Sequence, residues 1–385
     1  MTDPSITSAL AGRCVDCGVP FCHAACPLGN IVPEWSDLIW RDDWDGAAER
    51  LHATDNFPEI TGRLCPAPCE DACTLGATDE SVAIKCVEVE IIDRAWADRR
   101  VNPQVTPWQT SNTIAVVGSG PSGLAAAQQL TRAGHTIVVF ERDEAVGGLL
   151  RYGVPEFRLE RTVIDRRVKQ MRLEGTSFRT GVAIGTDITG TQLLERFDAV
   201  VLAIGAGLAR DLDVPGRGLA GVQQALAFLA PRIPVADGLV GVDVVVVGDG
   251  QVAADCVAEA IRQGAASATR VDAVSGFEGD GDGRVASVLV PGGDPVPAQA
   301  VVLAVGFLGP EPDGVVAQLG VRLDESGVIA RDRRFQTDVA RVFACGDAAR
   351  GPSSVAWAIA EGRSCAQAVD AWLQGRSGLP APIEV

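Results

Sequence analysis

The sequence has few aromatic residues, no hydrophobic run of membrane-spanning length and no excess of positive charge. Aromatic side chains make up 5% of the 385 residues and hydrophobic ones 47%, a balance typical of a well-buried α/β protein. The run Leu239–Val247 is too short to cross a bilayer and contains Asp243. No signal-peptide pattern opens the sequence. We therefore expect a cytoplasmic protein.

The charge balance is strongly acidic. Asp and Glu number 50 against 33 Lys and Arg, which gives a net charge of −17. This charge disfavours nucleic acid and anionic membranes as partners. It is compatible with a protein partner that carries a basic face, although most acidic proteins are simply soluble. The length is sufficient for two or three domains.

The segment Asn112–Glu141 has the pattern of a dinucleotide-binding unit. The apolar run Thr113–Val117 predicts a buried parallel strand, Leu124–Leu130 predicts a helix, and Thr136–Phe140 predicts a second strand. The turn between the first strand and the helix reads G-x-G-x-x-G. We expect this turn to bind a dinucleotide. The alternative is a glycine-rich turn in an ordinary α/β unit.

The glycine turn suits a pyrophosphate. Glycines permit a tight turn, close approach of the backbone to the ligand and close packing of helix on strand. The helix that follows offers free N–H groups and a positive dipole to the phosphates. Glu141 lies 23 residues after Gly118, where a carboxylate would hold a ribose hydroxyl. The candidate residues are Gly118, Ser119, Gly120, Pro121, Ser122, Gly123, Glu141 and Arg142.

A second nucleotide-binding pattern follows the strand predicted at Asp243–Val247. The turn reads G-x-G-x-x-A, an accepted variant of the first pattern. A helix at Ala254–Gln263, a strand near Ala268–Ala273 and a returning strand at Val301–Gly306 complete the unit. Two such patterns in one chain indicate one site for FAD and one for NAD(P)H. The candidate residues of the second site are Gly248, Gly250, Gln251, Ala253 and Gly306.

The end of the second strand of this unit carries an acid, Asp272. An acid there favours NADH over NADPH, because it binds the ribose diol and repels a 2′-phosphate. Arg270 is the only nearby basic residue, and strand periodicity puts it on the same side as Asp272. Two readings stay open: the unit binds NADH or NADPH, or it is a relic fold that only supports the flavin domain.

Eight of the eleven cysteines lie before residue 90. In a reducing compartment such crowding indicates metal or cluster ligation rather than disulfides. Spacings of two to four residues, with Pro27 after the first group, suit iron–sulfur clusters. Structural zinc is the alternative, but seven grouped cysteines do not divide into sites of two pairs. The groups are Cys14, Cys17, Cys22 and Cys26, then Cys65, Cys69 and Cys73, with Cys86 and Glu88 as candidates for an eighth ligand.

These motifs resemble the small chains of bacterial glutamate synthases. The resemblance rests on Cys14–Trp35, Leu51–Cys73 and the first glycine turn, and it covers nearly the whole chain. It implies an α+β multidomain fold, with an N-terminal α-helical domain holding two [4Fe–4S] clusters. Two interleaved doubly wound α/β nucleotide-binding domains, like those of glutathione reductase, would follow. The implied domains are 1–110 for the clusters, 111–211 and 333–385 for FAD, and 212–332 for a shortened NAD(P)H domain.

The resemblance also implies ligands. One cluster would be held by Cys14, Cys17, Cys22 and Cys73, and the other by Cys26, Cys65, Cys69 and Glu88, which leaves Cys86 as a non-ligand. The flavin would contact Gly148, Leu149 and Arg158, although Arg158 is equally compatible with a surface position. Flavoproteins of this kind also place Gly346, Asp347, Ser354 and Val355 near the flavin, at the start of a helix that stabilises the reduced ring.

The nucleotide domain departs from the family pattern. Gln251 and Val252 stand where the family has Asp and Thr, and the segment Phe277–Pro297 is shortened. The resemblance implies an oxidoreductase that moves electrons from NAD(P)H through FAD and the clusters to a partner protein. The alternative is an electron-transfer or scaffold subunit with a degenerate NAD(P)H site. The chain contains no amidotransferase or synthase centre of its own.

Overall fold

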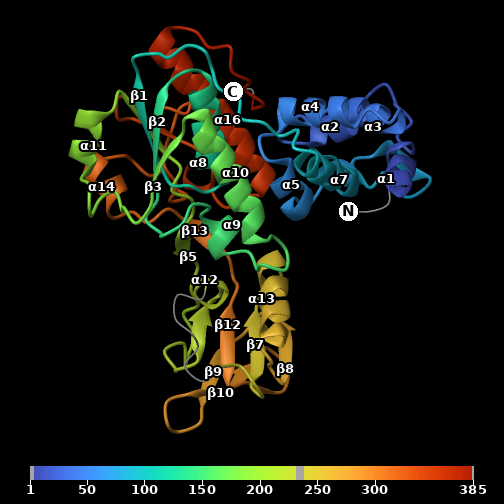
Figure 1. The fold of residues 1–385 in the computed structure, drawn as a ribbon. Coiled ribbons are helices and arrows are strands. Elements are labelled where there is room, and N and C mark those ends of the chain that lie inside the picture. Colours follow the sequence, from blue (N-terminus) through green and yellow to red (C-terminus); the bar gives the residue numbers. More distant parts are fainter. Residues whose placement is uncertain (1–3, 231–237, 384–385) are drawn as a thin grey trace. The chain divides into compact units, whose positions relative to one another are not determined.

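The computed structural model describes residues 4–230 and 238–383 (Figure 1). Contacts within the chain define two compact units. The large unit comprises Met1–Gly148, Arg158–Gly205 and Pro310–Val385, and the small unit comprises Leu149–Phe157 and Ala206–Gly309. Within the described part of the chain, no helix is long and apolar enough to cross a membrane.

The large unit begins with short helices that pack around one apolar core. Trp35, Ile39, Leu51 and Ile91 are fully buried in it. Its elements are α1 (Pro4–Ala11), α2 (Phe21–Ala25), α3 (Val32–Trp40), α4 (Trp44–Thr54), α5 (Pro58–Leu64), α6 (Pro68–Asp71), a 3₁₀ turn (Thr74–Ala77) and α7 (Ile84–Ala97).

The apolar residues at helical spacing over residues 34–51 belong to two helices, α3 and α4. Asp42 has a left-handed backbone with a φ of 63°. Asp43 then caps α4, because its carboxylate accepts a hydrogen bond of 2.9 Å from the Gly46 N–H. The chain therefore turns between α3 and α4, and both helices still bury their apolar faces in the same core.

The second part of the large unit is a parallel sheet of order β14-β4-β1-β2-β3. From β1 the chain adds β2 and β3 on one side and then β4 and β14 on the other, so the strand order reverses at β1. In open α/β sheets, ligands bind beyond the carboxyl ends of the strands at such a point. The strands are β1 (Thr113–Val117), β2 (Thr136–Phe140), β3 (Ser177–Arg179), β4 (Ala199–Leu202) and β14 (Val342–Ala344).

Two helices on one side of this sheet pack unusually closely. A Cβ atom on Gly362 of α16 would lie 2.2 Å from the Ser122 carbonyl oxygen of α8. Only glycine permits this approach, and Figure 1 shows the two helices side by side with α10. The helices of this part are α8 (Pro121–Arg132), α10 (Arg161–Glu174), α11 (Gly190–Arg196), α14 (Val315–Leu319), α15 (Asp347–Arg350) and α16 (Val355–Gln374).

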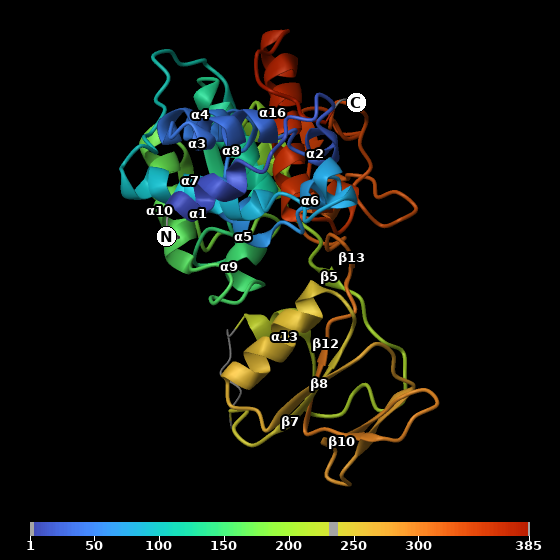
Figure 2. The ribbon, with the colours of Figure 1, turned by 90° about the vertical axis from the view of Figure 1, so that its right-hand side faces the viewer.

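The small unit is built on a parallel sheet of order β6-β12-β7-β8, with α13 against β7 and β8 (Figure 2). The short segment at 276–297 keeps a three-stranded antiparallel sheet. The elements are α9 (Leu149–Tyr152), β5 (Leu208–Ala209), β6 (Val222–Gln224), α12 (Ala225–Leu229), β7 (Asp243–Val247), α13 (Gln251–Arg262), β8 (Ser267–Val271), β9 (Gly276–Gly279), β10 (Val285–Leu289), β11 (Val296–Pro297), β12 (Ala300–Leu303) and β13 (Phe307–Gly309).

The predicted NAD(P)H domain, 212–332, and the small unit end at different residues. The small unit ends at Gly309. Helix α14 belongs to the large unit, because Val315 and Leu319 pack against Val117 and Leu202 of the five-stranded sheet. The helical domain and the flavin domain, whose boundary is predicted at residue 110, lie in one compact unit.

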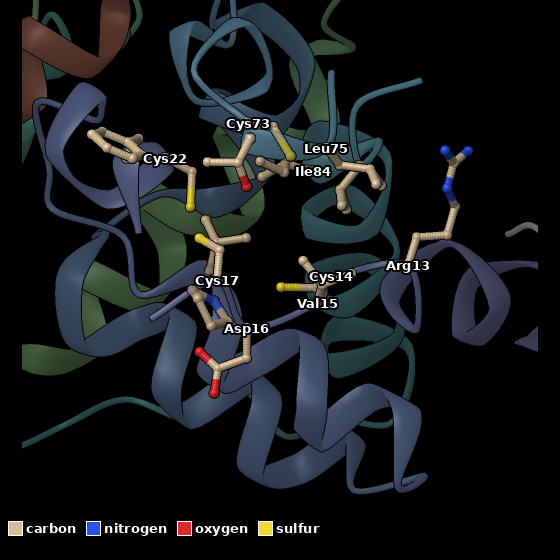
Figure 3. Close-up of a pocket in the computed structure, with 14 residues that line it drawn as sticks. Arg13, Cys14, Val15, Asp16, Cys17, Cys22, Cys73, Leu75 and Ile84 are labelled. Carbon is tan, nitrogen blue, oxygen red and sulfur yellow. The ribbon is translucent and has the colours of Figure 1, made fainter. Parts of the chain in front are cut away.

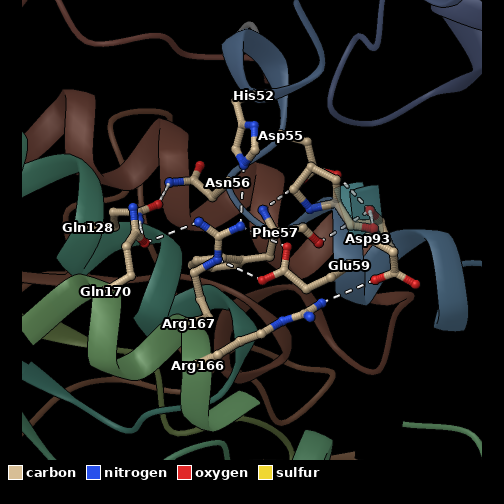
Figure 4. A network of polar contacts seen from close by, with 12 residues as sticks. His52, Asp55, Asn56, Phe57, Glu59, Asp93, Gln128, Arg166, Arg167 and Gln170 are labelled. Carbon is tan, nitrogen blue, oxygen red and sulfur yellow. Dashed lines mark hydrogen bonds and ion pairs between the residues drawn. The ribbon is translucent and has the colours of Figure 1, made fainter. Parts of the chain in front are cut away.

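A buried ion pair joins the helical domain to the flavin domain within the large unit (Figure 4). Arg167 of α10 donates to both carboxylate oxygens of Glu59, at 2.6 and 2.7 Å, and their side chains are 1% and 0% exposed. Burial raises the pKa of Glu59, but the Arg167 charge and its hydrogen bonds outweigh burial and leave that pKa below its ordinary value. Asn56 donates to Gln128 of α8 at 2.6 Å in the same network.

We expect Arg167→Leu to destabilise the large unit strongly. Removing one member of a buried ion pair leaves the other charge unpaired, at a cost of about 3–5 kcal/mol. Arg41→Leu is a matched control, because Arg41 forms an exposed pair with Asp37, and such pairs contribute less than about 1 kcal/mol. Urea denaturation of both variants measures the difference. Equal stabilities would contradict the structural role of Arg167.

Candidate cofactor sites

The first glycine turn has the geometry that a dinucleotide requires. Gly118 has a φ of 101°, and a Cβ atom there would lie 2.3 Å from the Ala203 carbonyl oxygen. A Cβ atom on Gly123 would lie 2.1 Å from the Gly118 carbonyl oxygen, so α8 begins close against the turn. Gly120 precedes α8, and a Cβ atom added to it would have no described contact within 4 Å. The turn therefore leaves backbone N–H groups accessible at a helix N-terminus.

Glu141 lies beside this turn at the end of β2. Its Oε2 accepts hydrogen bonds from the Ser119 N–H, at 3.1 Å, and from the Ser119 hydroxyl. Its Oε1 accepts from the Asp143 N–H at 2.9 Å, and the Gly147 N–H donates to Ser119 Oγ at 2.9 Å. The carboxylate is thus fixed where a ribose would lie, with lone pairs remaining for the hydroxyls.

The structure places the neighbouring candidates differently. Gly148 contacts the turn, since a Cβ atom on it would lie 2.9 Å from Gly120 Cα. Arg142 is exposed and forms an ion pair of 3.2 Å with Glu311. Leu149, which is 42% exposed, belongs to the small unit, and Arg158 is half-buried where the chain re-enters the large unit.

The downstream Gly-Asp pair meets the first turn. A Cβ atom on Gly346 would lie 2.4 Å from Ser122 Oγ, and Gly346 has a φ of 69°. Asp347 accepts a hydrogen bond of 2.6 Å from the Ser353 hydroxyl, and burial raises the pKa of Asp347 to about 6. Ser354 caps α16 by accepting from the Trp357 N–H at 3.5 Å. Ser354 and Val355 thus stand at the N-terminus of a long helix.

Glu361 is a buried acid beside the candidate flavin turn that the sequence analysis did not single out. Its Oε2 accepts a hydrogen bond of 2.9 Å from the Gly346 N–H, so it fixes the turn that presents Asp347. Arg331 donates to its Oε1 at 2.6 Å, and Glu361 is fully buried. A charged residue on the buried side of a predicted helix is the signal that could have identified it.

The second glycine turn, in the small unit, repeats the backbone geometry of the first. Gly248 has a φ of 137°, and a Cβ atom there would lie 2.3 Å from the Ala304 carbonyl oxygen. Gly250 precedes α13, and a Cβ atom added to it would likewise have no described contact within 4 Å. Gly306 has a φ of 93° after strand β12.

The side chains around the second turn differ from those around the first. Gln251 donates to Asp255 along the helix at 3.0 Å, and Ala253 is fully buried. Arg270 and Asp272 form an ion pair of 3.9 Å. The prediction that these two residues share one side is therefore confirmed.

Four cysteines line a hollow in the helical domain. Figure 3 shows their side chains arranged around it. They come from the loop after α1, from α2 and from the residue before the 3₁₀ turn. The four are Cys14, Cys17, Cys22 and Cys73.

A second hollow is lined by three further cysteines and a carboxylate. These residues are Cys26, Cys65, Cys69 and Glu88. Ala356, in the first turn of α16, also lines it. Cys86 is exposed and is not among the lining residues. The structure thus groups the sequence-predicted residues into two sets of four.

The electrostatics of the second hollow suit a positively charged occupant. Burial raises the pKa of Cys26 and of Cys65 to about 11, and it raises that of Cys69 further with the help of the neighbouring Cys26. Burial and then the charge of Asp55 raise the pKa of Glu88 to about 8. Burial thus favours the neutral form of all four groups, and a bound cation would shift them toward the anionic form in which they act as ligands. Thiolates and a carboxylate are ligands that iron accepts.

The first hollow shows the same trend. Burial raises the pKa of Cys14 and of Cys22, and the neighbouring thiols Cys17 and Cys73 add to the effect.

Among the described residues, no three His, Cys, Asp or Glu side chains are grouped closely enough to hold a single metal ion.

Two family models match the chain. Residues 2–100 match dihydropyrimidine dehydrogenase domain II, 4Fe-4S cluster. Residues 112–279 and 269–362 match pyridine nucleotide-disulphide oxidoreductase. The boundary between the two matches coincides with the end of the helical domain.

Individual proteins extend this similarity over almost the full length. Glutamate synthase [NADPH] small chain of Mycobacterium tuberculosis is 47% identical over 97% of this chain and 90% of its own. That alignment spans 438 positions, more than the 385 residues here, so the relative contains segments that this chain lacks. Glutamate synthase [NADH] of Schizosaccharomyces pombe is 35% identical over 96% of this chain and 21% of its own.

A solved structure shows the same fold at low identity. FprA of Mycobacterium tuberculosis in complex with NADPH superposes with a TM-score of 0.54 at 20% identity. The match covers 69% of this chain and 84% of FprA.

We expect Gly123→Ala to lower flavin binding. The added Cβ atom would lie 2.1 Å from the Gly118 carbonyl oxygen, so helix and turn must separate and the N–H groups lose their alignment. We expect affinity to fall about tenfold or more, measured as flavin absorbance per purified chain. Gly218→Ala is the control, because open space surrounds Gly218 in the described structure. Full flavin content in Gly123→Ala would contradict this role of the turn.

Proposed function

This chain belongs to the family of the glutamate synthase small chains, and on that premise we propose that it passes electrons from NAD(P)H through FAD and two [4Fe–4S] clusters to a larger partner chain. The family makes it an oxidoreductase with iron–sulfur and nucleotide-binding domains. The number of clusters, their ligands and the partner are the parts that we propose.

The observation that carries the proposal is the division of eight candidate ligands between two hollows. Cys14, Cys17, Cys22 and Cys73 line one, and Cys26, Cys65, Cys69 and Glu88 line the other. Each hollow takes cysteines from both sequence groups. Each supplies the four ligands that a cubane takes. The carboxylate ligand would alter the potential of its cluster through its charge and donor type.

The flavin domain would supply the contacts that bind FAD. When bound there, FAD converts two-electron hydride chemistry into one-electron steps. The first glycine turn would bind its pyrophosphate, and Glu141 would hold its ribose. The N-terminus of α16, capped by Ser354, would stabilise negative charge near the reduced ring.

Helix α16 suggests the order of electron transfer. Its N-terminus carries the cap Ser354 and then Val355, which are candidate flavin contacts, and Ala356, which lines the second hollow. The cluster of that hollow would therefore receive electrons from the flavin first. Cys17 of the first hollow is exposed, and Val15, Val19 and Phe21 around it are exposed apolar residues. This surface would face the acceptor.

The acceptor would be the partner of a small chain. The relative in Mycobacterium tuberculosis is named as a small chain, which supports a larger subunit as the acceptor. Family membership leaves the nucleotide open, since relatives are named for either NADPH or NADH. A cytoplasmic location stays a prediction from the sequence.

Anaerobic mixing with NADH or NADPH tests the proposal. We expect at least one nucleotide to bleach the flavin absorbance of the purified protein. The alternative is a scaffold subunit that has lost nucleotide use, and the observation behind it is that this chain lacks segments of the longer family members. If neither nucleotide bleaches the flavin while dithionite does, the scaffold function replaces the proposed one.

We expect Cys69→Ser to lose about half of the bound iron and acid-labile sulfide. Two cubanes contain about eight irons per chain, and a missing thiolate releases one of the two. Cys86→Ser is the matched control, because Cys86 is exposed and lies outside both hollows. Colorimetric iron and sulfide analysis of anaerobically purified protein measures both variants. Unchanged iron in Cys69→Ser, or an equal loss in Cys86→Ser, would refute the ligand set.

A further inference from the structure

One backbone hydrogen bond recurs at the same place in the two nucleotide folds of the chain. In the large unit, the Gly118 N–H donates to the Phe140 carbonyl oxygen at 2.8 Å. In the small unit, the Gly248 N–H donates to the Val271 carbonyl oxygen at 2.9 Å. Each bond joins the first glycine of the turn to the last residue of the second strand. The residues that follow these two strands are therefore equivalent.

Those equivalent residues are Glu141 and Asp272. Glu141 is buried and accepts hydrogen bonds from Ser119, the residue after the first glycine. In the small unit the position of Ser119 is taken by Asp249, which is exposed. The side chain of Asp272 is 75% exposed. The second turn thus presents two carboxylates where the first presents one carboxylate and a hydroxyl.

Charge in the small unit opposes a second phosphate at this place. Arg270, the cation nearest in sequence, already faces Asp272 at 3.9 Å. Arg217 and Arg262 are likewise paired with carboxylates. The sequence of the unit holds thirteen acidic residues against seven basic ones, and its only cations are arginines. A 2′-phosphate would add about two negative charges beside the carboxylates.

We propose that the hydride donor of this chain is NADH and that Asp272 is the residue that excludes NADPH. This inference rests on the function proposed above and names the substrate of the same site. The Asp272 carboxylate accepts hydrogen bonds from both hydroxyls of the adenosine ribose. The same carboxylate repels a 2′-phosphate within a few ångströms, which lowers NADPH affinity roughly ten- to a hundredfold. Asp249 adds to this repulsion.

Flavin reduction by the two nucleotides in wild type and Asp272→Asn tests the proposal. We expect wild type to favour NADH at least about tenfold in kcat/KM with ferricyanide as acceptor. Asp272→Asn removes the charge while keeping the size, so the NADH-to-NADPH ratio should fall about tenfold or more. Asp294→Asn is the matched control, because Asp294 is an exposed acid between β10 and β11, and its ratio should equal that of wild type.

Two results would overturn the proposal: a wild-type preference for NADPH, or an unchanged ratio in Asp272→Asn. Failure of the proposed function gives a different result, in which neither nucleotide reduces the flavin. In that case, calorimetric binding of ADP-ribose and 2′-phospho-ADP-ribose to flavin-loaded protein decides the inference. Tighter binding of ADP-ribose in wild type, weakened in Asp272→Asn, would support it. Equal or tighter binding of the phosphorylated fragment would overturn it.

Discussion

The close packing of α16 on α8 is the contact on which the cofactor sites depend. Gly362 leaves no room for a side chain against the Ser122 carbonyl oxygen, so the two helices are held in one register. From α16, Glu361 fixes the Gly346 N–H of the flavin domain, and Ala356 lines the second thiol hollow. Arg363 donates to Asn56 at 2.5 Å and to the Ala53 carbonyl oxygen at 2.9 Å in the helical domain. One helix thus connects the flavin turn, a cluster hollow and the helical domain.

Buried charge makes this connection specific. Burial lowers the pKa of Arg363 to about 10 and raises that of Asp55 to about 6. The Thr61 hydroxyl lies between the carboxyl groups of Asp55 and Glu88. Because Glu88 lines the second hollow, this hydrogen-bond network extends from Asp55 to that hollow. Groups of this kind are costly to bury unless each finds its partner. We infer that they specify how the two domains meet, as does the pair of Arg167 and Glu59.

Local sequence patterns predicted the parts of the fold whose geometry is local. The glycine turns were predictable because a backbone position with a positive φ, or with no room for a Cβ atom, requires glycine. The strands at Thr113–Val117 and Asp243–Val247 have the predicted bounds. Thiol spacing indicated clusters, but the sorting of cysteines between hollows came only from the family resemblance. The split near Asp42, the return of α14 to the large unit and the role of Glu361 depend on long-range packing. Periodicity within one segment does not encode such contacts.

Freeze-quench electron paramagnetic resonance of the anaerobic protein after mixing with NADH tests the central claim most directly. If α16 holds the flavin and cluster sites in one compact unit, electrons pass within one chain. Reduced-cluster signals should then appear after flavin reduction at a rate that does not change when the protein is diluted tenfold. A reduced flavin with clusters that stay oxidised, or a rate proportional to protein concentration, would contradict the account.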